Sequence, residues 1–198
     1  MAEREIDVRT IARSERHPLV FAAYARLGVG DALRLINDHE PRHLRDEFER
    51  ELPDSFDWQP IGPADDGSFV TRIVKITAAP LPHLIGDTAE LPAAIGSTGS
   101  GSIWQLSPAE RDLDANVIEL PPGDEIAAHD GPDLDVLVHV LAGSGTLETA
   151  RGTIVLTAGA LLWLPRRARR RFVAGRDGMR YLSVHGRKPS LTITSVPH

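Results

Sequence analysis

The sequence predicts an α+β protein of two domains, a two-layer βαβαββ domain followed by an all-β domain. Over residues 1–77, short apolar strands alternate with helical patterns. Residues 78–102 are rich in Ala, Pro, Gly and Ser and end in GSTGSGS, which is the composition of a flexible linker. Over residues 103–198, short apolar strands separated by turns predict an antiparallel sandwich or barrel.

The first domain begins with a predicted strand at Glu5–Val8. Pro18 should open the following helix, because proline has the φ angle of a first helical residue and needs no hydrogen-bond acceptor there. Gly28 and Gly30 should close this helix. Its expected buried stripe consists of Leu19, Ala23, Tyr24 and Leu27.

A second apolar strand is predicted at Asp31–Ile36, and Pro41 should open a second helix. Leu44, Phe48 and Leu52 have the spacing of its buried face. Phe56–Ile61 and Ser68–Ile76 flank a turn-rich segment and are predicted to form a hairpin. The order of elements is therefore βαβαββ.

Five strands stand out in the second domain: Asn116–Leu120, Val136–Leu141, Gly152–Thr157, Leu161–Leu164 and Arg180–His185. In the second of these, Val136, Val138 and Val140 alternate with other residues, so if they face the interior, His139 faces outward. Leu161 and Trp163 share one face, for which core packing is the expectation and ligand stacking the alternative.

Composition excludes several classes of function. The 198 residues are 41% hydrophobic and 25% charged. The sequence contains no run of membrane-spanning length, which argues against a membrane partner. The formal net charge of −6 argues against binding to nucleic acid. The basic run Arg166–Arg171 is predicted to form a solvated edge, with anion contact as the alternative. No signal peptide is evident at the N-terminus.

Cysteine is absent from the sequence. The protein therefore has no disulfide, no thiolate metal ligand and no cysteine nucleophile. A reducing, cytoplasmic location fits this composition.

The first domain resembles the SirA-like, or TusA-like, family of sulfur carriers over roughly residues 4 to 76. The resemblance lies in the order of elements and in a proline at the first helix. In that family a Cys-Pro pair carries a persulfide, but this chain has His17-Pro18. With the stretches RHPLVF and NDHEP, it is more similar to an uncharacterised His-Pro branch. The resemblance implies the fold, and the missing cysteine excludes the persulfide chemistry.

His17 and His39 follow successive parallel strands of such a fold, so they should be neighbours at one edge of the sheet. Three roles are open. His17 and Asp38 or His39 could cap the two helices, the histidines could hold a metal or a haem, or the helix N-termini could bind an anion.

The second domain is similar to the cupin superfamily over about residues 104 to 188, which implies a jelly-roll barrel. The first cupin motif reads G-x5-H-x-H-x4-E-x6-G, and the chain supplies Gly123, His129 and Gly143 at those positions. The second motif reads G-x5-P-x-G-x2-H-x3-N, and here Gly159 and Pro165 match.

The metal-ligand positions of the cupin motifs are mostly lost. Gly131 replaces the second histidine, Val136 the glutamate and Arg170 the histidine of the second motif, so only His129 remains. The family's site of three histidines and one glutamate cannot form. A rearranged site for a divalent transition metal would need His129 together with Asp135 and His185, or help from Asp130, Asp133 or His139.

Arg170 suggests another use of the barrel, because a guanidinium directed inward would bind a carboxylate or a phosphate. Strand alternation cannot fix its direction, since the basic run spans a turn. The candidate ligand-binding residues are Arg170, His129 and Trp163.

Three functions are therefore predicted. The first is a small-molecule binding or sensor protein. The others are a metal-dependent cupin enzyme, such as an oxygenase or isomerase, using His129, and a metal- or haem-linked redox role through His17 and His39. A homodimer formed through the barrel is expected, because open sheet edges pair.

Overall fold

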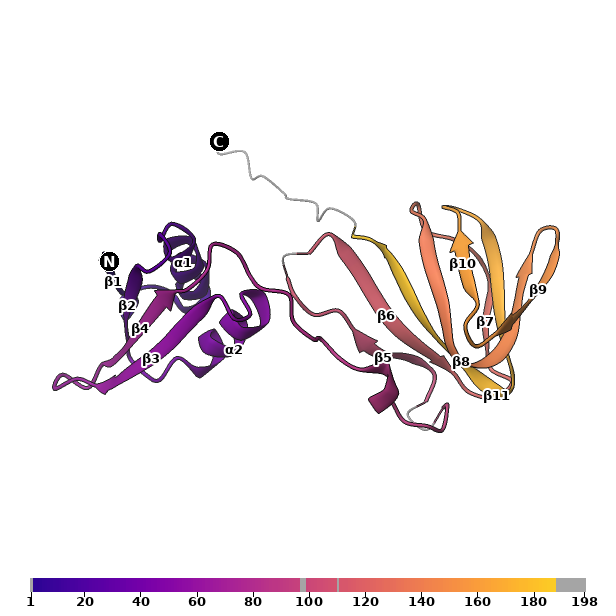
Figure 1. Ribbon diagram of the computed structural model, residues 1–198, viewed down its shortest axis with the longest axis horizontal. Helices are drawn as coiled ribbons and strands as arrows, with labels where there is room; N and C mark the ends of the chain where they lie inside the picture. Colours follow the sequence, from indigo (N-terminus) through magenta and orange to yellow (C-terminus); the bar gives the residue numbers. More distant parts are fainter. Residues whose placement is uncertain (1, 97–98, 110, 188–198) are drawn as a thin grey trace. The chain divides into compact units, whose positions relative to one another are not determined.

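The computed structural model describes residues 2–96, 99–109 and 111–187. The chain divides into two compact units, Met1–Leu84 and Ile85–His198. Strands predominate, and the two α-helices both lie in the first unit (Figure 1).

The first unit has one four-stranded sheet in the order β1-β2-β4-β3. β1 and β2 are parallel neighbours, and β4 lies antiparallel between β2 and β3. The elements, in chain order, are β1 (Glu3–Asp7), α1 (Arg13–Ala25), β2 (Ala32–Asn37), α2 (Arg42–Glu51), β3 (Phe56–Pro63) and β4 (Phe69–Lys75).

Phe48 of α2, which is fully buried, occupies the centre of the first core. Its ring lies 4.4 Å from that of Phe21 and makes edge contacts with Tyr24 and Trp58 at 5.2 and 5.6 Å between centroids. Such aromatic pairs contribute beyond their buried area. Residues of both helices and of β2 share this cluster, so the helices form a layer on the sheet.

Helix α1 differs from its predicted bounds. It begins at Arg13, so Pro18 lies inside the helix rather than at its start. The helical phase places Val20 in the core, whereas Leu19 is 40% exposed. The two helices have Ala12 and Pro41 as N-cap residues, and neither has a side-chain cap. The predicted capping by His17, Asp38 or His39 is therefore wrong.

The second unit is an antiparallel assembly with the path β10-β8-β11-β6-β5, in which β7 also pairs with β11 and β9 with β8. Its elements are β5 (Gly101–Gln105), β6 (Leu113–Leu120), β7 (Glu125–Asp130), β8 (Val136–Thr149), β9 (Gly152–Thr157), β10 (Leu161–Leu164) and β11 (Arg169–Gly186), preceded by the 3-10 helix η1 (Thr88–Glu90).

The long strands β8 and β11 form the frame of this barrel. Their ladder has register shifts near Ala174 and Met179. Gly143 has φ +73°, and a Cβ there would lie 2.1 Å from the carbonyl oxygen of Gly178, so only glycine permits this approach. The predicted strands Val136–Leu141 and Arg180–His185 are parts of these longer elements.

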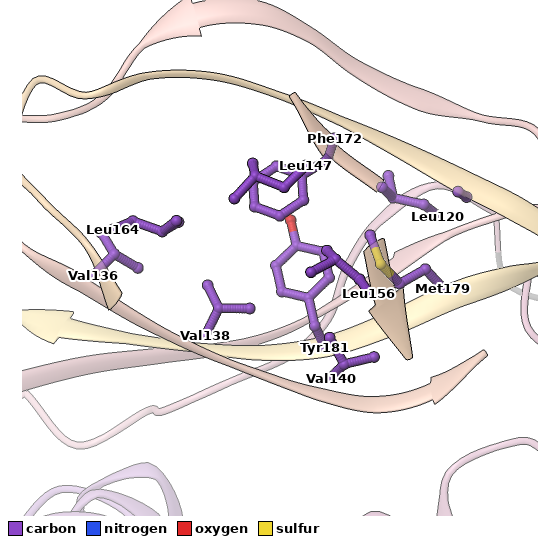
Figure 2. Packing of buried hydrophobic residues seen from close by; sticks show 11 residues of the cluster. Leu120, Val136, Val138, Val140, Leu147, Leu156, Leu164, Phe172, Met179 and Tyr181 are labelled. Atoms are coloured by element: carbon purple, nitrogen blue, oxygen red, sulfur yellow. The ribbon is translucent and has the colours of Figure 1, made fainter. Parts of the chain in front are cut away.

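Apolar side chains from five strands fill the barrel (Figure 2). Val136, Val138 and Val140 are buried, and His139 lies out of phase with them, as the alternation predicts. Phe172 and Tyr181 stack at 5.4 Å between ring centroids with an interplanar angle of 12°.

Part of the segment 78–102, predicted as a flexible linker, is attached to the second unit. Glu119 accepts a hydrogen bond from the amide of Gly96 at 3.1 Å, and the carbonyl of Pro92 accepts one from Arg180. Ile95 packs so closely on Gly178 that an added Cβ would lie 2.6 Å from its Cγ2. Residues 92–96 therefore belong to the barrel.

Candidate functional site

The basic run Arg166–Arg171 enters β11, and most of its arginines are paired with carboxylates. These pairs are largely exposed, so solvent screening leaves each of them a small contribution to stability. They join Arg166 to Asp135, Arg167 to Asp133, Arg169 to Asp130, and Arg171 to Glu125 and Glu148.

Arg170 differs from its neighbours in the run. It shares the inward face of β11 with Phe172 and Ala174, and it is only 7% exposed. Its Nη1 atom is buried and has no hydrogen-bond partner within the described part of the chain. Burial lowers the pKa of Arg170, because the charged form is poorly solvated, while nearby Tyr181 acts in the opposite direction. Among the described residues, Arg170 is thus the inward cation of this run that lacks a counter-ion.

A cavity of about 550 Å³ adjoins Arg170. Apolar side chains from β8, β9 and β10 form one part of its lining, and the guanidinium groups of Arg151, Arg169 and Arg170 supply positive charge. These apolar residues are Leu147, Ile154, Leu162, Trp163 and Leu164. Such a cavity suits a molecule with an apolar body and one anionic group.

Trp163 and Leu161 do share one face, but that face is not in the core. Their exposed fractions are 67% and 70%. The expectation of core packing was wrong, because the inward positions of the short strand β10 belong to Leu162 and Leu164, which contact the barrel core. Trp163 instead lines the same cavity as Arg170, with most of its side chain exposed to solvent.

The position of the second cupin histidine is filled by the arginine. A Cβ on Gly131 would lie 3.0 Å from both Cζ and Nη2 of Arg170. Val136, at the glutamate position, is part of the apolar core. His129 pairs with Arg170 across β7 and β11 but is exposed, and its Nδ1 lies 2.9 Å from the carbonyl oxygen of Ala127.

The other metal candidates of the barrel are dispersed. Asp135 accepts a hydrogen bond of 2.9 Å from the amide of Arg166. His185 lies near the far end of β11, opposite Val136 and Asp114, and its Nδ1 is 3.0 Å from the carbonyl oxygen of Gly186. Across residues 2–96, 99–109 and 111–187, no three His, Cys, Asp or Glu side chains form a group that could hold a metal. The residues at the cupin ligand positions do not fit a metal centre.

In the first unit, His17 and His39 line one cavity of about 700 Å³. Nδ1 of His17 lies 2.6 Å from Oε2 of Glu47, and Nδ1 of His39 contacts Oδ1 of Asp38. His43 lines the same cavity. The three histidines thus line one cavity, and His17 and His39 each contact a carboxylate.

Sequence reasoning did not find the partners of the arginines. The carboxylates that pair with the basic run precede their partners by 23 to 46 positions, and only strand pairing brings them together. Tyr181 was also missed. Burial raises its pKa to about 12, and the positive charge of Arg170 acts against that rise, which places the phenol and the guanidinium in one neighbourhood.

Comparison with known proteins gives separate results for the two units. Residues 5–75 match the family described as an uncharacterized conserved protein, DUF2249. The structural neighbours of the chain are cupin proteins. The SirA-like resemblance of the first unit stays a prediction. No curated protein matches the chain.

Three of these cupin structures show the extent of the similarity. The protein from Desulfitobacterium hafniense has a TM-score of 0.43 and 17% identity, over 57% of this chain and 94% of its own. A cupin from Bacteroides fragilis has a TM-score of 0.38 and 21% identity, over 46% and 83%. A cupin-2 protein from Shewanella frigidimarina has a TM-score of 0.38 and 18% identity, over 46% and 87%.

The helices of the described part of the chain are short. None of its helices has the length and apolar character needed to cross a bilayer.

Proposed function

We propose that the second unit binds a small organic anion, with Arg170 holding its carboxylate and the apolar side chains of the cavity holding its body. The observation that carries this proposal is the buried Nη1 of Arg170, which lacks a partner among the described residues and adjoins a cavity of about 550 Å³. An unpaired buried charge costs free energy, and a bound carboxylate would offset that cost.

The lining favours a flat or compact apolar body. Leu147, Leu162 and Leu164 offer aliphatic surface, and Trp163 offers an exposed aromatic face at the margin. Arg169 lines the same cavity, but Asp130 lies 3.5 Å from its guanidinium. Arg151 also lines the cavity but is exposed to solvent. Arg170 is buried, and its Nη1 has no partner among the described residues, so it is the principal anchor for the anion.

The proposed function also includes a role for the first unit and a dimeric state of the protein. The first unit is a SirA-like domain that has no persulfide chemistry, since the chain lacks cysteine, and it serves the barrel as a docking or relay module. Barrels of two chains pair as a homodimer in the cytoplasm, and the ligand is a small molecule rather than a nucleic acid or a membrane. A metal-dependent reaction is not proposed, because the observed side chains favour an anion site.

Benzoate and its neutral analogue benzamide test the anion requirement. Benzoate should raise the melting temperature of the protein, because a ligand that binds only the folded state stabilises it, whereas benzamide should not. In Arg170→Met this effect of benzoate should vanish, although the variant should be at least as stable without ligand, since methionine removes the unpaired charge.

Arg176→Met is the matched control, because the side chain of Arg176 in β11 is 92% exposed and does not line the cavity. It should keep the response to benzoate. Equal responses to benzoate and benzamide, or an undiminished response in Arg170→Met, would refute the proposal.

A further inference from the structure

The cavity of about 700 Å³ in the first unit lies where the segments after β1 and β2 meet. β1 and β2 are parallel neighbours, so the chain leaves both strands at the same edge of the sheet. Residues on both sides of this edge line the cavity, including Arg13, Arg16 and His17 after β1 and His39 and His43 after β2.

The first turns of both helices contribute to this lining. Arg13 is the first residue of α1, and His43 and Leu44 belong to the first turn of α2. Neither helix has a side-chain cap, and the first turn of α2 contains no acidic residue. Amide groups at a helix N-terminus attract anions when no side chain satisfies them.

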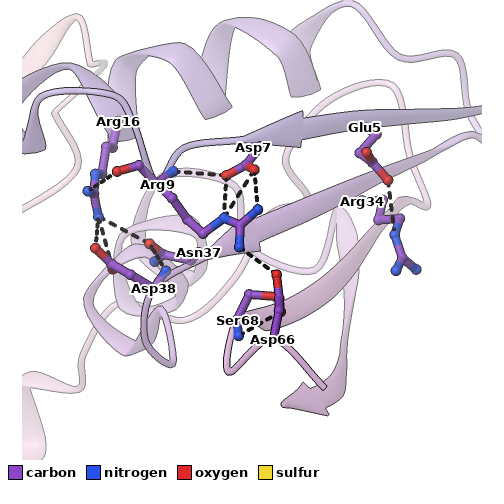
Figure 3. Close-up of polar contacts among 9 residues, drawn as sticks. All are labelled: Glu5, Asp7, Arg9, Arg16, Arg34, Asn37, Asp38, Asp66 and Ser68. Carbon is purple, nitrogen blue, oxygen red and sulfur yellow. Dashed lines mark hydrogen bonds and ion pairs between the residues drawn. The ribbon is translucent and has the colours of Figure 1, made fainter. Parts of the chain in front are cut away.

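The two arginines of the cavity have different roles. Arg16 donates to the carbonyl oxygen of Ile11 at 2.9 Å. It also donates to Asn37 at 3.2 Å and to Asp38 at 3.1 Å, so it fastens the first helix to the end of β2 (Figure 3). Arg13 is exposed and has no ion-pair or hydrogen-bond partner among the described residues. Its guanidinium is therefore the cation available to a ligand.

The imidazoles are oriented by carboxylates. Nδ1 of His17 donates to Glu47, and Nδ1 of His39 donates to Asp38, because a carboxylate only accepts. In each neutral ring this leaves Nε2 as an acceptor for a ligand hydroxyl. The cavity thus offers donors for charged oxygens beside acceptors for an acidic hydrogen.

From this combination we infer that the first unit binds the phosphate group of a small phosphate monoester. The second pKa of such a group is about 6. Near neutral pH it therefore presents charged oxygens and, in part, an acidic hydroxyl. Arg13 and the helix amides hold the charged oxygens, and His17 and His39 hold the oxygen that gains or loses its proton. Val20, Leu35 and Leu44 form an apolar floor for the organic part.

Isothermal titration of the full chain with phenyl phosphate, inorganic phosphate and sulfate tests this inference. Phenyl phosphate should bind more tightly than inorganic phosphate, and sulfate, which has no acidic hydrogen near neutral pH, should bind about tenfold more weakly than either. Binding of inorganic phosphate as tight as that of phenyl phosphate would overturn the monoester and leave free phosphate as the ligand. Equal binding of sulfate would overturn the role of the imidazoles.

Arg13→Gln should weaken binding of phenyl phosphate by about tenfold or more, since one charge-assisted contact is lost. Arg26→Gln is the control, because Arg26 is exposed at the other end of α1 and outside the cavity. Equal affinities of the two variants, or no binding by the intact protein, would overturn the inference. In an Arg170→Met background, which lacks the anion anchor of the barrel, Arg13→Gln should cause the same loss of phenyl phosphate binding, which separates this site from the anion site of the barrel.

Discussion

Arg180 donates a hydrogen bond of 2.8 Å from Nε to Oε1 of Glu119, and the two side chains are 6% and 0% exposed. The pair joins β11 to β6, which are adjacent in the barrel. The same two residues hold the preceding segment, through the carbonyl of Pro92 and the amide of Gly96. A buried ion pair thus couples the barrel to a stretch of chain without regular structure.

Loss of one partner of this pair should destabilise the second unit strongly. Arg180→Met leaves Glu119 buried without its counter-ion, which should lower the free energy of unfolding by about 3–5 kcal/mol. Arg180→Met combined with Glu119→Leu should recover most of this loss, because a hydrophobic pair replaces the ion pair. Urea unfolding measures both, with exposed Arg176→Met as the control. A single variant as stable as the native protein would contradict this coupling.

The contact between Gly131 and Arg170 predicts the outcome of an attempt to restore a metal ligand. In Gly131→His, the new side chain must displace the guanidinium, since a Cβ there already lies 3.0 Å from Arg170 Cζ. Anion binding at the barrel should therefore weaken, and no stoichiometric zinc or nickel should be gained. Metal analysis after dialysis and titration with benzoate check the two outcomes. Retention of a full equivalent of metal together with unchanged benzoate binding would contradict this prediction.

The direction of Arg170 could not be derived from the sequence, although the residue itself was identified. The chain turns between Pro165 and Arg169, and Arg167 adopts φ 61° at the place where the second cupin motif has glycine. This turn sets the phase with which β11 begins. Only the three-dimensional register then decides that Arg170, rather than Arg169 or Arg171, is directed inward.

Strong local patterns were easier to interpret. β10 was predicted with its observed bounds, and the alternating valines of β8 identified the inner face of that strand. The prediction that Pro18 opens the first helix was wrong. Proline inside a helix removes one hydrogen bond, and it is tolerated here because the tertiary contacts of Val20 and Tyr24 compensate for that loss. Local propensity thus located the elements, whereas packing determined where they begin.

Asp66 predicts an acid-dependent loss of stability in the first unit. Its pKa is lowered to about 2, first by hydrogen bonds from the hydroxyl and amide of Ser68 at 2.6 and 3.0 Å and then by Arg9 (Figure 3). The unfolded chain, in which the pKa is near 3.8, takes up the proton first. The stabilisation is therefore complete above about pH 4 and is lost as the pH falls toward 2.

Denaturant unfolding across this pH range, followed by the amide signals of the first core, measures the loss. Asp66→Asn should flatten the pH dependence. Asp65→Asn should leave it unchanged, because Asp65 is exposed and makes no hydrogen bond among the described residues. The same slope in both variants would show that other carboxylates control the acid stability of this unit.

Tyr181 predicts the opposite behaviour of the second unit at alkaline pH. Burial raises its pKa to about 12, against a model-peptide value of 10.0, while the charge of Arg170 lowers it. Between these two values the unfolded chain has already lost the phenolic proton that the folded chain still holds. The second unit should therefore lose stability as the pH rises from 10 to 12, by on the order of 2 kcal/mol.

Ultraviolet titration of the phenol in a Tyr24→Phe background tests this assignment, because the chain has only two tyrosines. Arg170→Met should move the Tyr181 transition to still higher pH, since a nearby positive charge stabilises the phenolate. Tyr181→Phe should keep the stack on Phe172 and lose the alkaline slope of stability. An unchanged pH of the Tyr181 transition in Arg170→Met would mean that the charge of the guanidinium does not act on Tyr181. The phenol would then not be a neighbour of the anchor of the proposed anion site.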